Sequence, residues 1–566
     1  MNGLDRSVSR EEKERRDSGG FADENAIDHD GVGRHSVNEV LSQRTTPKSL
    51  PKWIELPSSE QQIVQVDALT IDKPSFFDLP QEDIYYFLSS QLVFSRIFVF
   101  FIQLLFGGRD YSTDAFKGVP TASDQLGYLD VFLQRLVAGF NKWDAIHFMQ
   151  ITKYGYIFET SLAFFPVFPY SVRLISYCWA TSFIYAGLVH PTTAHMLSAT
   201  MLNFVSFFVT GHVLFRICRA LTHSCKCAVI SVILFAFNPA SIFFSASYSE
   251  SLFALFTFSG ILLLVDDQLG PFSLRLFLSL PLFMLGYGTR SNGLLNLGYV
   301  AFYCGREFLW RPTEIEGQRQ FILNLPRPTI IRSACLFISR LVMSLLLVIC
   351  VVYYHSARER RHFCTNSTLD TIPPVLKNFA VTHDLVMPGQ VDKITWCRVS
   401  SFFFPPFYSA IQSRYWAVSL FGYWQIKKLP CFLLAAPAVW IVAFGALNQF
   451  RRISKGNIWR ILAEGGDLIP FTLHAVFLCC GSLLIYNAEV FTRILFSSSP
   501  FAYIVLAKWM SEVTPQARLS DTMEPSVLPF VSHFFWRGGK AVFVYFYFTA
   551  YFVCGTSFHA MFLPFT

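Results

Sequence analysis

Long runs of apolar side chains with few charges between them constrain this chain more than any other feature of its sequence. The 566 residues are 52% hydrophobic and 15% charged, whereas about a quarter of a soluble globular chain is charged. Runs such as Phe98-Val99-Phe100-Phe101 contribute to a total of 61 Phe, which is far more than a soluble core needs. The sequence therefore predicts an all-α integral membrane protein that crosses the bilayer many times.

The apolar spans set the expected organisation of this membrane domain. A window of about 20 residues, the length of one crossing, finds spans that begin at Leu92, Ser161, Leu197, Ala228, Leu252, Leu274, Ala334, Cys431, Phe471, Phe496 and Val542. Several are shorter than a full crossing or contain Pro, and broken helices are tolerated where they line a cavity or are buried in protein. We expect about 10 to 13 helices.

The charged segments between the spans set the expected orientation. Residues 1–85 are polar and are predicted to form a disordered cytosolic tail, which leaves 86–566 as the membrane domain. Basic residues gather at 305–333 and 449–460, and Lys and Arg accumulate in cytoplasmic loops. This arrangement places two large loops, at about 107–160 and 355–429, on the luminal side. The second loop carries Asn366-Ser367-Thr368, a candidate glycosylation sequon, which needs a luminal face.

Three classes of function receive no support from the sequence. The net charge of +7 comes from basic residues between apolar runs and forms no single patch, so nucleic-acid binding is not expected. The 13 Cys are scattered and odd in number, which is not a disulfide framework, and Cys225 with Cys227 lacks the second ligand pair that zinc needs. No nucleotide-binding fingerprint occurs, so a glycosyltransferase on this chain would need a lipid-linked donor.

Acidic residues gather in the first predicted luminal loop. Asp110, Asp114 and Asp144 lie there, and helical spacing places His147 on the same face as Asp144 within the stretch 141–156. A carboxylate with a His three residues later, beside a membrane surface, suits general-base activation of a sugar hydroxyl. The spacing is equally compatible with an Asp144 that caps a surface helix and a solvated His147.

Two arginines lie between apolar runs, at Arg290 and Arg493. Ionisable groups in such places usually face a cavity or a partner. A guanidinium matches phosphate with a bidentate fork, so both are candidates for binding a lipid phosphate. The alternatives are snorkelling to the interface and internal pairing with Glu250 or Glu489.

Side chains suited to binding a sugar occur both before and after Arg290 in the sequence. Glu250 and Tyr248 follow a Pro-broken segment, and the second luminal loop is rich in aromatic and amide groups. A helix cap is an equal reading for Glu250, and interfacial Tyr and Trp are more often membrane anchors. The candidate sugar-binding or acceptor-binding residues are Glu250, Tyr248, Asn292, Gln412, Tyr415 and Trp416.

Taken together, these motifs resemble the PIG-V family of GPI mannosyltransferases. The likeness is carried, in family order, by DYSTDAF at 110–116, the stretch 141–156, NPAS with YSES, RSNGLLNLGY, IQSRYWAV, VFTR with SSSP, and the terminal FLPFT. These motifs extend over roughly residues 90–566. The polar tail lies outside the resemblance.

The resemblance implies a polytopic GT-C glycosyltransferase fold in the endoplasmic reticulum membrane. Such an enzyme adds the second mannose, in α1,6 linkage, to the GPI-anchor precursor and takes it from dolichyl-phosphate-mannose. No cofactor or metal is expected, because the leaving group is a lipid phosphate. The implied partners are membrane lipids, the donor, the GPI precursor and a small membrane subunit. A dolichyl-phosphate-sugar transferase with another acceptor and a lipid or solute transporter are the alternatives, although the internal repeats typical of transporters are absent from the sequence.

The resemblance also assigns roles to individual residues. Asp144 matches the Asp of the family's Trp-Asp motif and is the preferred base, with Asp110 second. Asp114 stands where the family also uses Glu. Arg290 and Arg493 match two family arginines, which we expect to bind the donor phosphate.

Cys364 and Cys397 match two Cys of one luminal loop, which implies a disulfide between them. Two departures from the family pattern stand out. Asn487-Ala488-Glu489 replaces a stretch expected to carry His or Gln, and Ser419 stands where the family tends to have Gly. These departures bear on acceptor contacts and on packing around 408–416.

Overall fold

The computed structural model describes residues 80–111, 116–120, 126–315, 318–323, 330–365, 372–398, 405–455, 468–513 and 542–563. The chain divides into two units, and all described residues belong to the second, which begins at Lys73. Most of the predicted tail therefore lies outside the described residues. So do Asp114 and the sequon residue Asn366.

Helix α2 (Gln81–Phe106) is the first described helix, and it begins before residue 86, the predicted start of the membrane domain. Glu82 and Asp83 made the segment look like part of the polar tail. Both lie in the first turn, where carboxylates interact favourably with the helix dipole. Ile84 and Phe87 are already buried, so the core face starts a turn earlier than the apolar run suggested.

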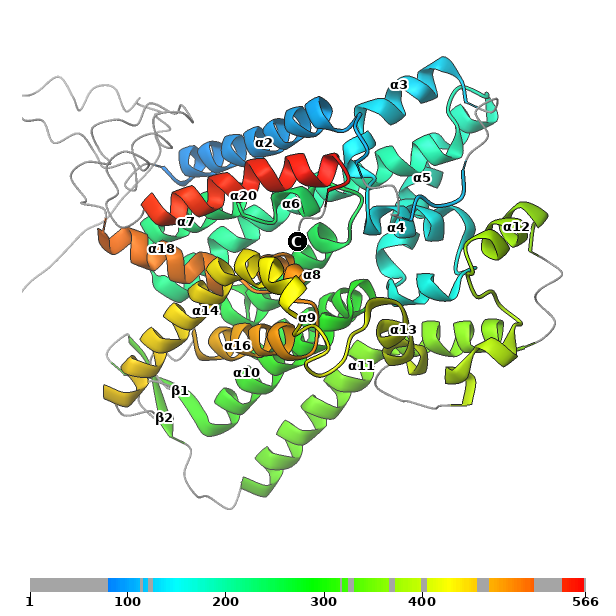
Figure 1. Ribbon diagram of the computed structural model, residues 1–566. Coiled ribbons are helices and arrows are strands. Elements are labelled where there is room, and N and C mark those ends of the chain that lie inside the picture. Colours follow the sequence, from blue (N-terminus) through cyan, green and yellow to red (C-terminus); the bar gives the residue numbers. More distant parts are fainter. Residues whose placement is uncertain are drawn as a thin grey trace, which may run out of the picture. The chain divides into compact units, whose positions relative to one another are not determined.

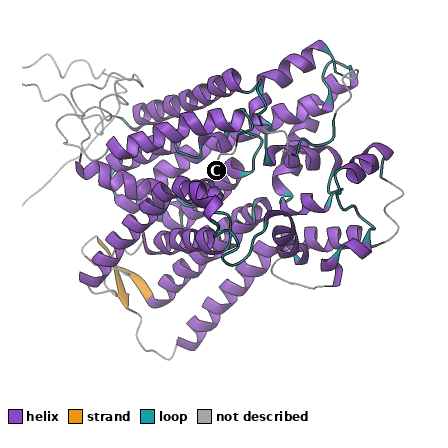
Figure 2. Ribbon diagram, in the orientation of Figure 1, coloured by secondary structure: helices purple, strands orange, loops and turns teal. Residues whose placement is uncertain are grey.

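Helices form most of the described chain, which confirms the all-α prediction apart from one β-hairpin (Figure 2). Five helices are long and apolar enough to cross a membrane, and the bent pair α17–α18, broken by 76°, would make a sixth. The long helices are α2, α6 (Pro191–Thr222), α9 (Phe272–Thr289), α11 (Ile330–Cys364) and α14 (Leu429–Lys455), and the bent pair is α17 (Phe491–Ser498) and α18 (Phe501–Val513).

Several of the apolar runs were expected to be shorter than a full crossing. Among the described residues, three of them form the shorter apolar helices α7 (Cys225–Ala236), α8 (Glu250–Val265) and α16 (Leu468–Leu484). At 1.5 Å per residue, the 12 residues of α7 extend about 18 Å, whereas a bilayer core is about 30 Å thick. An apolar run in this sequence is therefore not always a full crossing.

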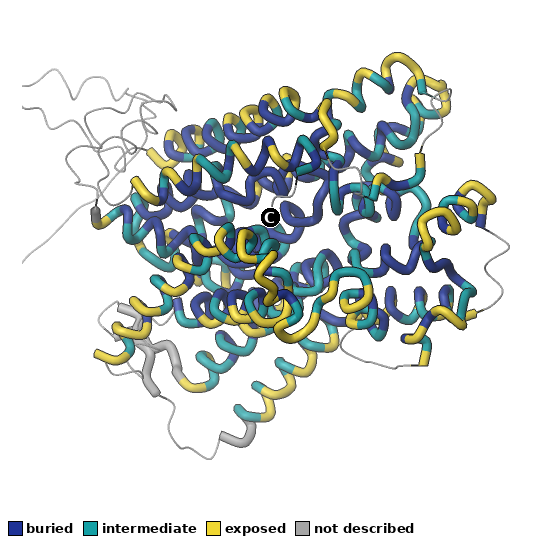
Figure 3. Tube along the Cα trace, viewed as in Figure 1, coloured by how far each residue is buried: buried dark blue, intermediate teal, exposed yellow. Residues whose placement is uncertain are grey.

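Short helices α7 and α8 lie inside the bundle rather than at its surface (Figures 1 and 3). Every residue of α7 from Cys227 to Ala236 is buried, and most of α8 is buried as well. A helix that is apolar all round is one that neighbours enclose. The described residues also form the helices α5 (Val167–Tyr185), α10 (Leu297–Leu309) and α20 (Val542–Ala560). They further contain the 3₁₀ segments η5 (Ser241–Phe244), η6 (Asp267–Leu269), η7 (Ser291–Asn296) and η12 (Ala488–Val490).

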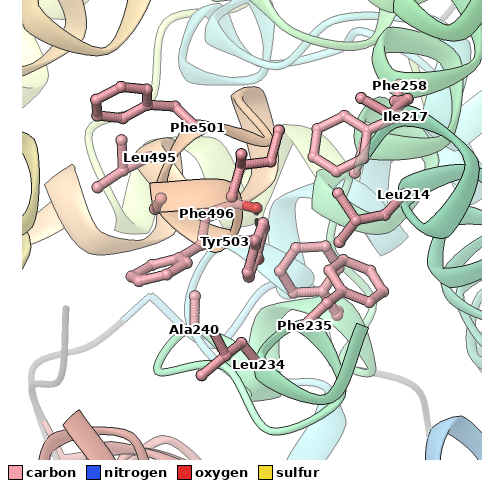
Figure 4. Packing of buried hydrophobic residues seen from close by; sticks show 14 of the residues in the cluster. Leu214, Ile217, Leu234, Phe235, Ala240, Phe258, Leu495, Phe496, Phe501 and Tyr503 are labelled. Atoms are coloured by element: carbon pink, nitrogen blue, oxygen red, sulfur yellow. Dashed lines mark hydrogen bonds between the residues drawn. The ribbon is translucent and has the colours of Figure 1, made fainter. Parts of the chain in front are cut away.

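Aromatic packing joins α7 to the broken pair α17–α18 (Figure 4). The ring of Tyr503 meets that of Phe235 edge-on at 5.5 Å, and its hydroxyl donates to the carbonyl of Phe496 at 2.8 Å. Phe235 in turn stacks on Phe207 of α6 at 4.5 Å. The buried Tyr hydroxyl is thus satisfied by a backbone carbonyl near the helix break, where such groups lose their helical partners.

The two predicted luminal loops are largely helical. The first contains α3 (Tyr128–Leu136), η3 (Ala138–Phe140), α4 (Asp144–Tyr154) and η4 (Glu159–Ala163), and the second contains α12 (Pro374–Thr382), η9 (Val391–Lys393), η10 (Thr395–Arg398), α13 (Pro406–Trp416) and η11 (Ile426–Lys428). Figure 1 shows α4, α12 and α13 at one end of the bundle. The antiparallel hairpin β1 (Trp310–Ile315) and β2 (Gln318–Leu323) lies at the opposite end.

Helix α11 carries the second loop away from the bundle. Its 35 residues extend about 52 Å, so it is longer than a bilayer core is thick. At its end Cys364 forms a disulfide with Cys397 of η10, with Cα atoms 5.8 Å apart. This is the pairing that the family resemblance implied, and it ties the start of the loop to a point 33 residues later.

A buried guanidinium, which the sequence analysis did not identify, organises the centre of the bundle. Arg96 of α2 donates to the carbonyls of Ala236 at 3.0 Å and Ser241 at 2.9 Å, and to the Ser245 hydroxyl at 2.8 Å. It lies 3.8 Å from the ring centroid of Phe207. These acceptors follow the end of α7, so Arg96 satisfies carbonyls that the helix itself leaves unpaired.

Replacing this guanidinium should destabilise the bundle. Arg96→Met keeps an apolar stem but leaves two buried carbonyls without donors, and we expect a loss of at least about 2 kcal/mol in the free energy of unfolding. Thermal unfolding of the detergent-solubilised protein measures the loss. Arg219→Met, at an exposed position of α6, is the matched control and should change little. Equal stability of the two variants would contradict this role for Arg96.

Candidate active site

The first turn of α4 is set by an unusual backbone conformation. Trp143 has φ 55° and ψ −126°, values that favour glycine, and the N–H of Ala145 bonds back to the carbonyl of Lys142 at 3.2 Å. Such a conformation costs about 1–3 kcal/mol for a non-glycine residue. The turn leaves the N–H of Asp144 free to donate to the hydroxyl of Tyr248 at 3.1 Å. Asp144 is thereby fixed at the helix start.

Four charged groups of alternating sign meet at this point and are called here the charge chain. Asp144 Oδ2 lies 2.8 Å from Arg493 Nη1, and Arg493 Nε lies 3.6 Å from Glu250 Oε1. Glu250 also forms an ion pair with Arg290. The charge chain connects α4, α17, α8 and the end of α9, and its formal charges sum to zero. Of the alternatives left open for Arg290, pairing with Glu250 is the one that the structure contains.

Glu250 is the innermost member of the charge chain. Its side chain has no exposed surface, whereas 28% of the Asp144 side chain is exposed. A buried carboxylate needs opposite charges close by, and two guanidinium groups supply them. The buried position of Glu250 favours a role in holding Arg290 and Arg493 over direct contact with a sugar. Of the two carboxylates, Asp144 is the one that a substrate can reach.

The protonation states at α4 follow from these contacts. Burial raises the pKa of Asp144, but the charge and hydrogen bond of Arg493 outweigh it and hold the pKa below the ordinary value of 3.8. Burial lowers the pKa of His147 to about 4, against the opposing effect of the Asp144 charge. The His147 ring is stacked between Phe116 at 4.5 Å and Phe164 at 4.9 Å. At neutral pH, Asp144 is therefore ionised and His147 is neutral.

Tyr248 holds the first turn of α4 in position. Besides receiving the N–H of Asp144, its hydroxyl lies 3.4 Å from the carbonyl of Lys142 and 3.4 Å from Nε2 of His559. Its carbonyl accepts from Asn203 at 2.9 Å. Only 1% of Tyr248 is exposed, so its surroundings favour a positioning role over the predicted sugar contact. Neither His559 nor Asn203 was identified from the sequence, because both contact Tyr248 from distant positions in the chain.

Asp110, the second candidate base, lies outside the charge chain. Its carboxylate pairs with Lys142, and 41% of its side chain is exposed. Lys142 was not singled out in the sequence, although it stands within the stretch 141–156. Asp110 and Asp144 thus occupy neighbouring positions but have different partners, and Asp110 is the more exposed of the two.

The Arg-Ser-Asn-Gly segment connects the charge chain to two other helices. Asn292 donates to the hydroxyl of Ser498 in α17 at 2.6 Å, and Ser291 bonds to the hydroxyl of Tyr408 in α13 at 2.7 Å. Asn292 Oδ1 is buried and has no hydrogen-bond partner within the part of the chain that the structure describes. The segment therefore fixes Arg290 between α13 and α17, and it retains one unused acceptor.

A buried carboxylate that the sequence analysis missed holds the two loops together. Glu159 is 2% exposed and accepts from Trp396 Nε1 at 2.7 Å and from the Tyr415 hydroxyl at 2.8 Å. Arg414 pairs with it at 3.2 Å. The only sequence signal was an acidic residue within an apolar stretch, because its partners are more than 200 residues away. Tyr415, predicted to bind sugar, has its hydroxyl committed to this contact.

Of the other two predicted residues of α13, Trp416 has a ring contact that leads toward α4. The ring of Trp416 meets Phe164 edge-on at 6.1 Å, and Phe164 stacks on His147. Trp416 is thus one aromatic ring away from the face that carries Asp144. Gln412 is half-buried on the same helix. Of the predicted sugar-binding residues, Trp416 is the one that this ring contact connects to the Asp144 face.

The arrangement supplies a base and cations side by side. Asp144 can accept a proton, while Arg493 and Arg290 carry positive charge that a developing anion could use. Both arginines are already paired with carboxylates of the protein. Glu489, the other partner considered for Arg493, instead accepts from Tyr423 at 2.7 Å. No group of three or more His, Cys, Asp or Glu suited to a metal ion occurs among the described residues.

The Asp144–Arg493 contact can be tested by a double-mutant cycle. Arg493→Met leaves both Asp144 and Glu250 short of a partner, and Asp144→Asn removes one of those charges. We expect the double variant to be less destabilised than the sum of the single variants, with a coupling energy of about 0.5–3 kcal/mol. Chemical or thermal unfolding in detergent measures it. Additive effects would mean that the ion pair does not form.

Comparison with known proteins identifies the family of this chain. Residues 86–566 match the family described as Mannosyltransferase (PIG-V). GPI mannosyltransferase pigv-1 of Caenorhabditis elegans is 31% identical over 85% of this chain and 81% of its own length. GPI alpha-1,6-mannosyltransferase 2 of Homo sapiens is 28% identical over 83% of this chain and 96% of its own length.

Among solved structures, the archaeal oligosaccharyltransferase AglB of Archaeoglobus fulgidus covers 84% of this chain and 56% of its own length. Its TM-score is 0.41 at 10% identity, a likeness too slight to assign a fold. The sequence comparisons decide the family, because the family match extends from residue 86, within α2, to residue 566. The chain belongs to the mannosyltransferase (PIG-V) family.

Proposed function

We propose that this mannosyltransferase transfers mannose from dolichyl-phosphate-mannose to a GPI precursor in the endoplasmic reticulum membrane, as an α1,6-mannosyltransferase that adds the second mannose. The family and the names of the relatives support the acceptor and the linkage. The observation that carries the site is the contact of a partly exposed, ionised Asp144 with Arg493. We place α4 and α13 on the luminal side and the hairpin end in the cytosol.

Asp144 would act as the general base. The acceptor 6-hydroxyl oxygen forms a bond to the anomeric carbon of mannose, and its proton passes to the Asp144 carboxylate. The bond between that carbon and the phosphate oxygen breaks, and its electron pair leaves with dolichyl phosphate. Attack opposite the leaving group inverts the anomeric configuration. The exposed part of Asp144 is the side from which the hydroxyl would approach.

The charge chain would stabilise the leaving group as charge moves. Before reaction, Arg493 balances the Asp144 carboxylate at 2.8 Å. When Asp144 takes the proton it becomes neutral, and at the same time the lipid phosphate gains a negative charge. The guanidinium of Arg493 is then released to the phosphate, with Arg290 held beside it by Glu250. An interaction that strengthens only as the bond breaks lowers the barrier rather than merely improving binding.

Loss of the base should abolish transfer without loss of the protein. In cells that lack GPI mannosyltransferase 2, wild type should restore GPI-anchored proteins to the surface and Asp144→Asn should not, at equal protein levels. Asp110→Asn is the matched comparison, and we expect it to retain at least partial function because Asp110 is outside the charge chain. Flow cytometry of a GPI-anchored marker measures the outcome. Full rescue by Asp144→Asn would exclude Asp144 as the base.

The lowered pKa values predict how transfer depends on pH. The pKa of Asp144 lies below its ordinary value and that of His147 is lowered to about 4, so neither group should limit the rate between pH 5 and 8. Transfer of labelled mannose in proteoliposomes, followed across that range, measures the profile. His147→Asn is the control variant and should leave its shape unchanged. An acid limb near pH 6.5 that disappears in His147→Asn would contradict a neutral His147.

A further inference from the structure

An apolar groove runs between α2 and α6 and ends beside the candidate active site. It encloses about 310 Å³. Its walls are Ile97, Phe100 and Phe101 of α2, Thr200 and Phe204 of α6, and Phe140 of η3. Both flanking helices are of membrane-spanning length and composition. Phe101 is 55% and Phe204 is 40% exposed, so the groove is open at the surface that the bilayer would cover.

The inner end of the groove is continuous with the backbone of the site. Phe140 precedes the turn that sets Asp144, and its carbonyl accepts the N–H of Ser247 at 3.0 Å. The Ser247 hydroxyl donates to Asn141 at 2.8 Å. Ser245, at the floor of the groove, belongs to the segment that leads to Glu250. The two hydrogen-bonded segments that contain Phe140 and Ser247 thus separate the groove from the charge chain.

The groove offers no charge to a headgroup. Arg96 is the only ionisable residue in its lining, and its guanidinium is committed to the carbonyls of Ala236 and Ser241 and to the Ser245 hydroxyl. The remaining surface is almost wholly aromatic and aliphatic. A hydrocarbon chain is the ligand that such walls favour, since burial of apolar area is the main interaction they can provide.

We propose that this groove holds the first isoprene units of the donor's dolichol chain. The proposal rests on the proposed function. In the donor, the hydrocarbon begins at the same phosphate that leaves from the anomeric carbon, so it must start next to the charge chain. In the acceptor, the reacting hydroxyl is separated from its lipid by at least the inositol and the first mannose. The chain that enters the bilayer within a few residues of Asp144 is therefore the donor's.

Two further features fit a single isoprenoid chain. A groove of this volume, lying between only two helices, accommodates one chain, whereas a phosphatidylinositol anchor carries two. Phe100, Phe101, Phe140 and Phe204 present ring faces and edges at which the methyl branches and double bonds of isoprene units can pack. Lys142, two residues beyond Phe140, is the nearest cation in the sequence to the end of the groove.

Filling the groove tests the proposal kinetically. Thr200→Phe places a ring in the groove, and Met201→Phe places the same ring on the adjacent, lipid-exposed position of α6. In proteoliposomes we expect Thr200→Phe to raise the KM for dolichyl-phosphate-mannose at least about tenfold, equivalent to about 1.4 kcal/mol. The KM for the GPI precursor should stay within about twofold. Met201→Phe should resemble wild type. Ile97→Trp, from the opposite wall, gives a second variant should Thr200→Phe fail to fold.

A rise in the KM of the acceptor alone would mean that the acceptor lipid occupies the groove, which overturns the proposal. No change in either KM would mean that the groove holds bulk lipid, with the same consequence. A labelling experiment separates these outcomes from failure of the proposed function, because it needs no turnover. Dolichyl phosphate with a diazirine on its first isoprene unit should label α2 and α6 in the wild-type protein. Unlabelled dolichyl phosphate, but not phosphatidylinositol, should compete. Labelling elsewhere would overturn the proposal even if transfer is observed.

Discussion

The fully buried carboxylate of Glu250 is the interaction on which the site depends. It pairs with Arg290 and lies 3.6 Å from Arg493, so the ends of α8, α9 and α17 must converge on one point. Removing any one of these charges would leave an uncompensated charge inside protein, which costs several kcal/mol. Asp144 joins the same chain through Arg493. The position of the exposed acid is thus set by the buried one.

The charges of the four groups cancel in the structure. In the proposed mechanism, proton transfer to Asp144 would remove one negative charge from the charge chain as the leaving phosphate gains one. Arg493 would then turn from Asp144 to the phosphate rather than being recruited from solvent. Because the ion pairs already orient these groups, little reorganisation would accompany such a reaction.

The sequence revealed the members of the charge chain and left pairing with Glu250 open for the arginines, but it did not reveal the contact between Asp144 and Arg493. Asp144, Arg290 and Arg493 stand out because ionisable residues beside apolar runs are rare and expensive. The contact between Asp144 and Arg493 joins residues 349 apart, and no spacing rule reaches that far. Glu159 escaped notice for the same reason, since Trp396 and Tyr415 come from the other loop. The first turn of α2 was assigned to the polar tail, because acidic residues in a first turn look the same as a polar linker.

Apolar runs that are not full-length helices bear on the candidate site. Short helices α7 and α8 and the broken pair α17–α18 read as spans because apolar composition does not distinguish an enclosed helix from a lipid-facing one. The site lies at the starts of two of these helices, because Glu250 is the first residue of α8 and Arg493 lies in the first turn of α17. Asp144 is the first residue of α4, and Arg290 directly follows α9. Carboxylates at helix starts and a cation at a helix end each gain from the helix dipole. Helices that stop within the bundle therefore provide both the room for a polar site and part of the energy that keeps its charges there.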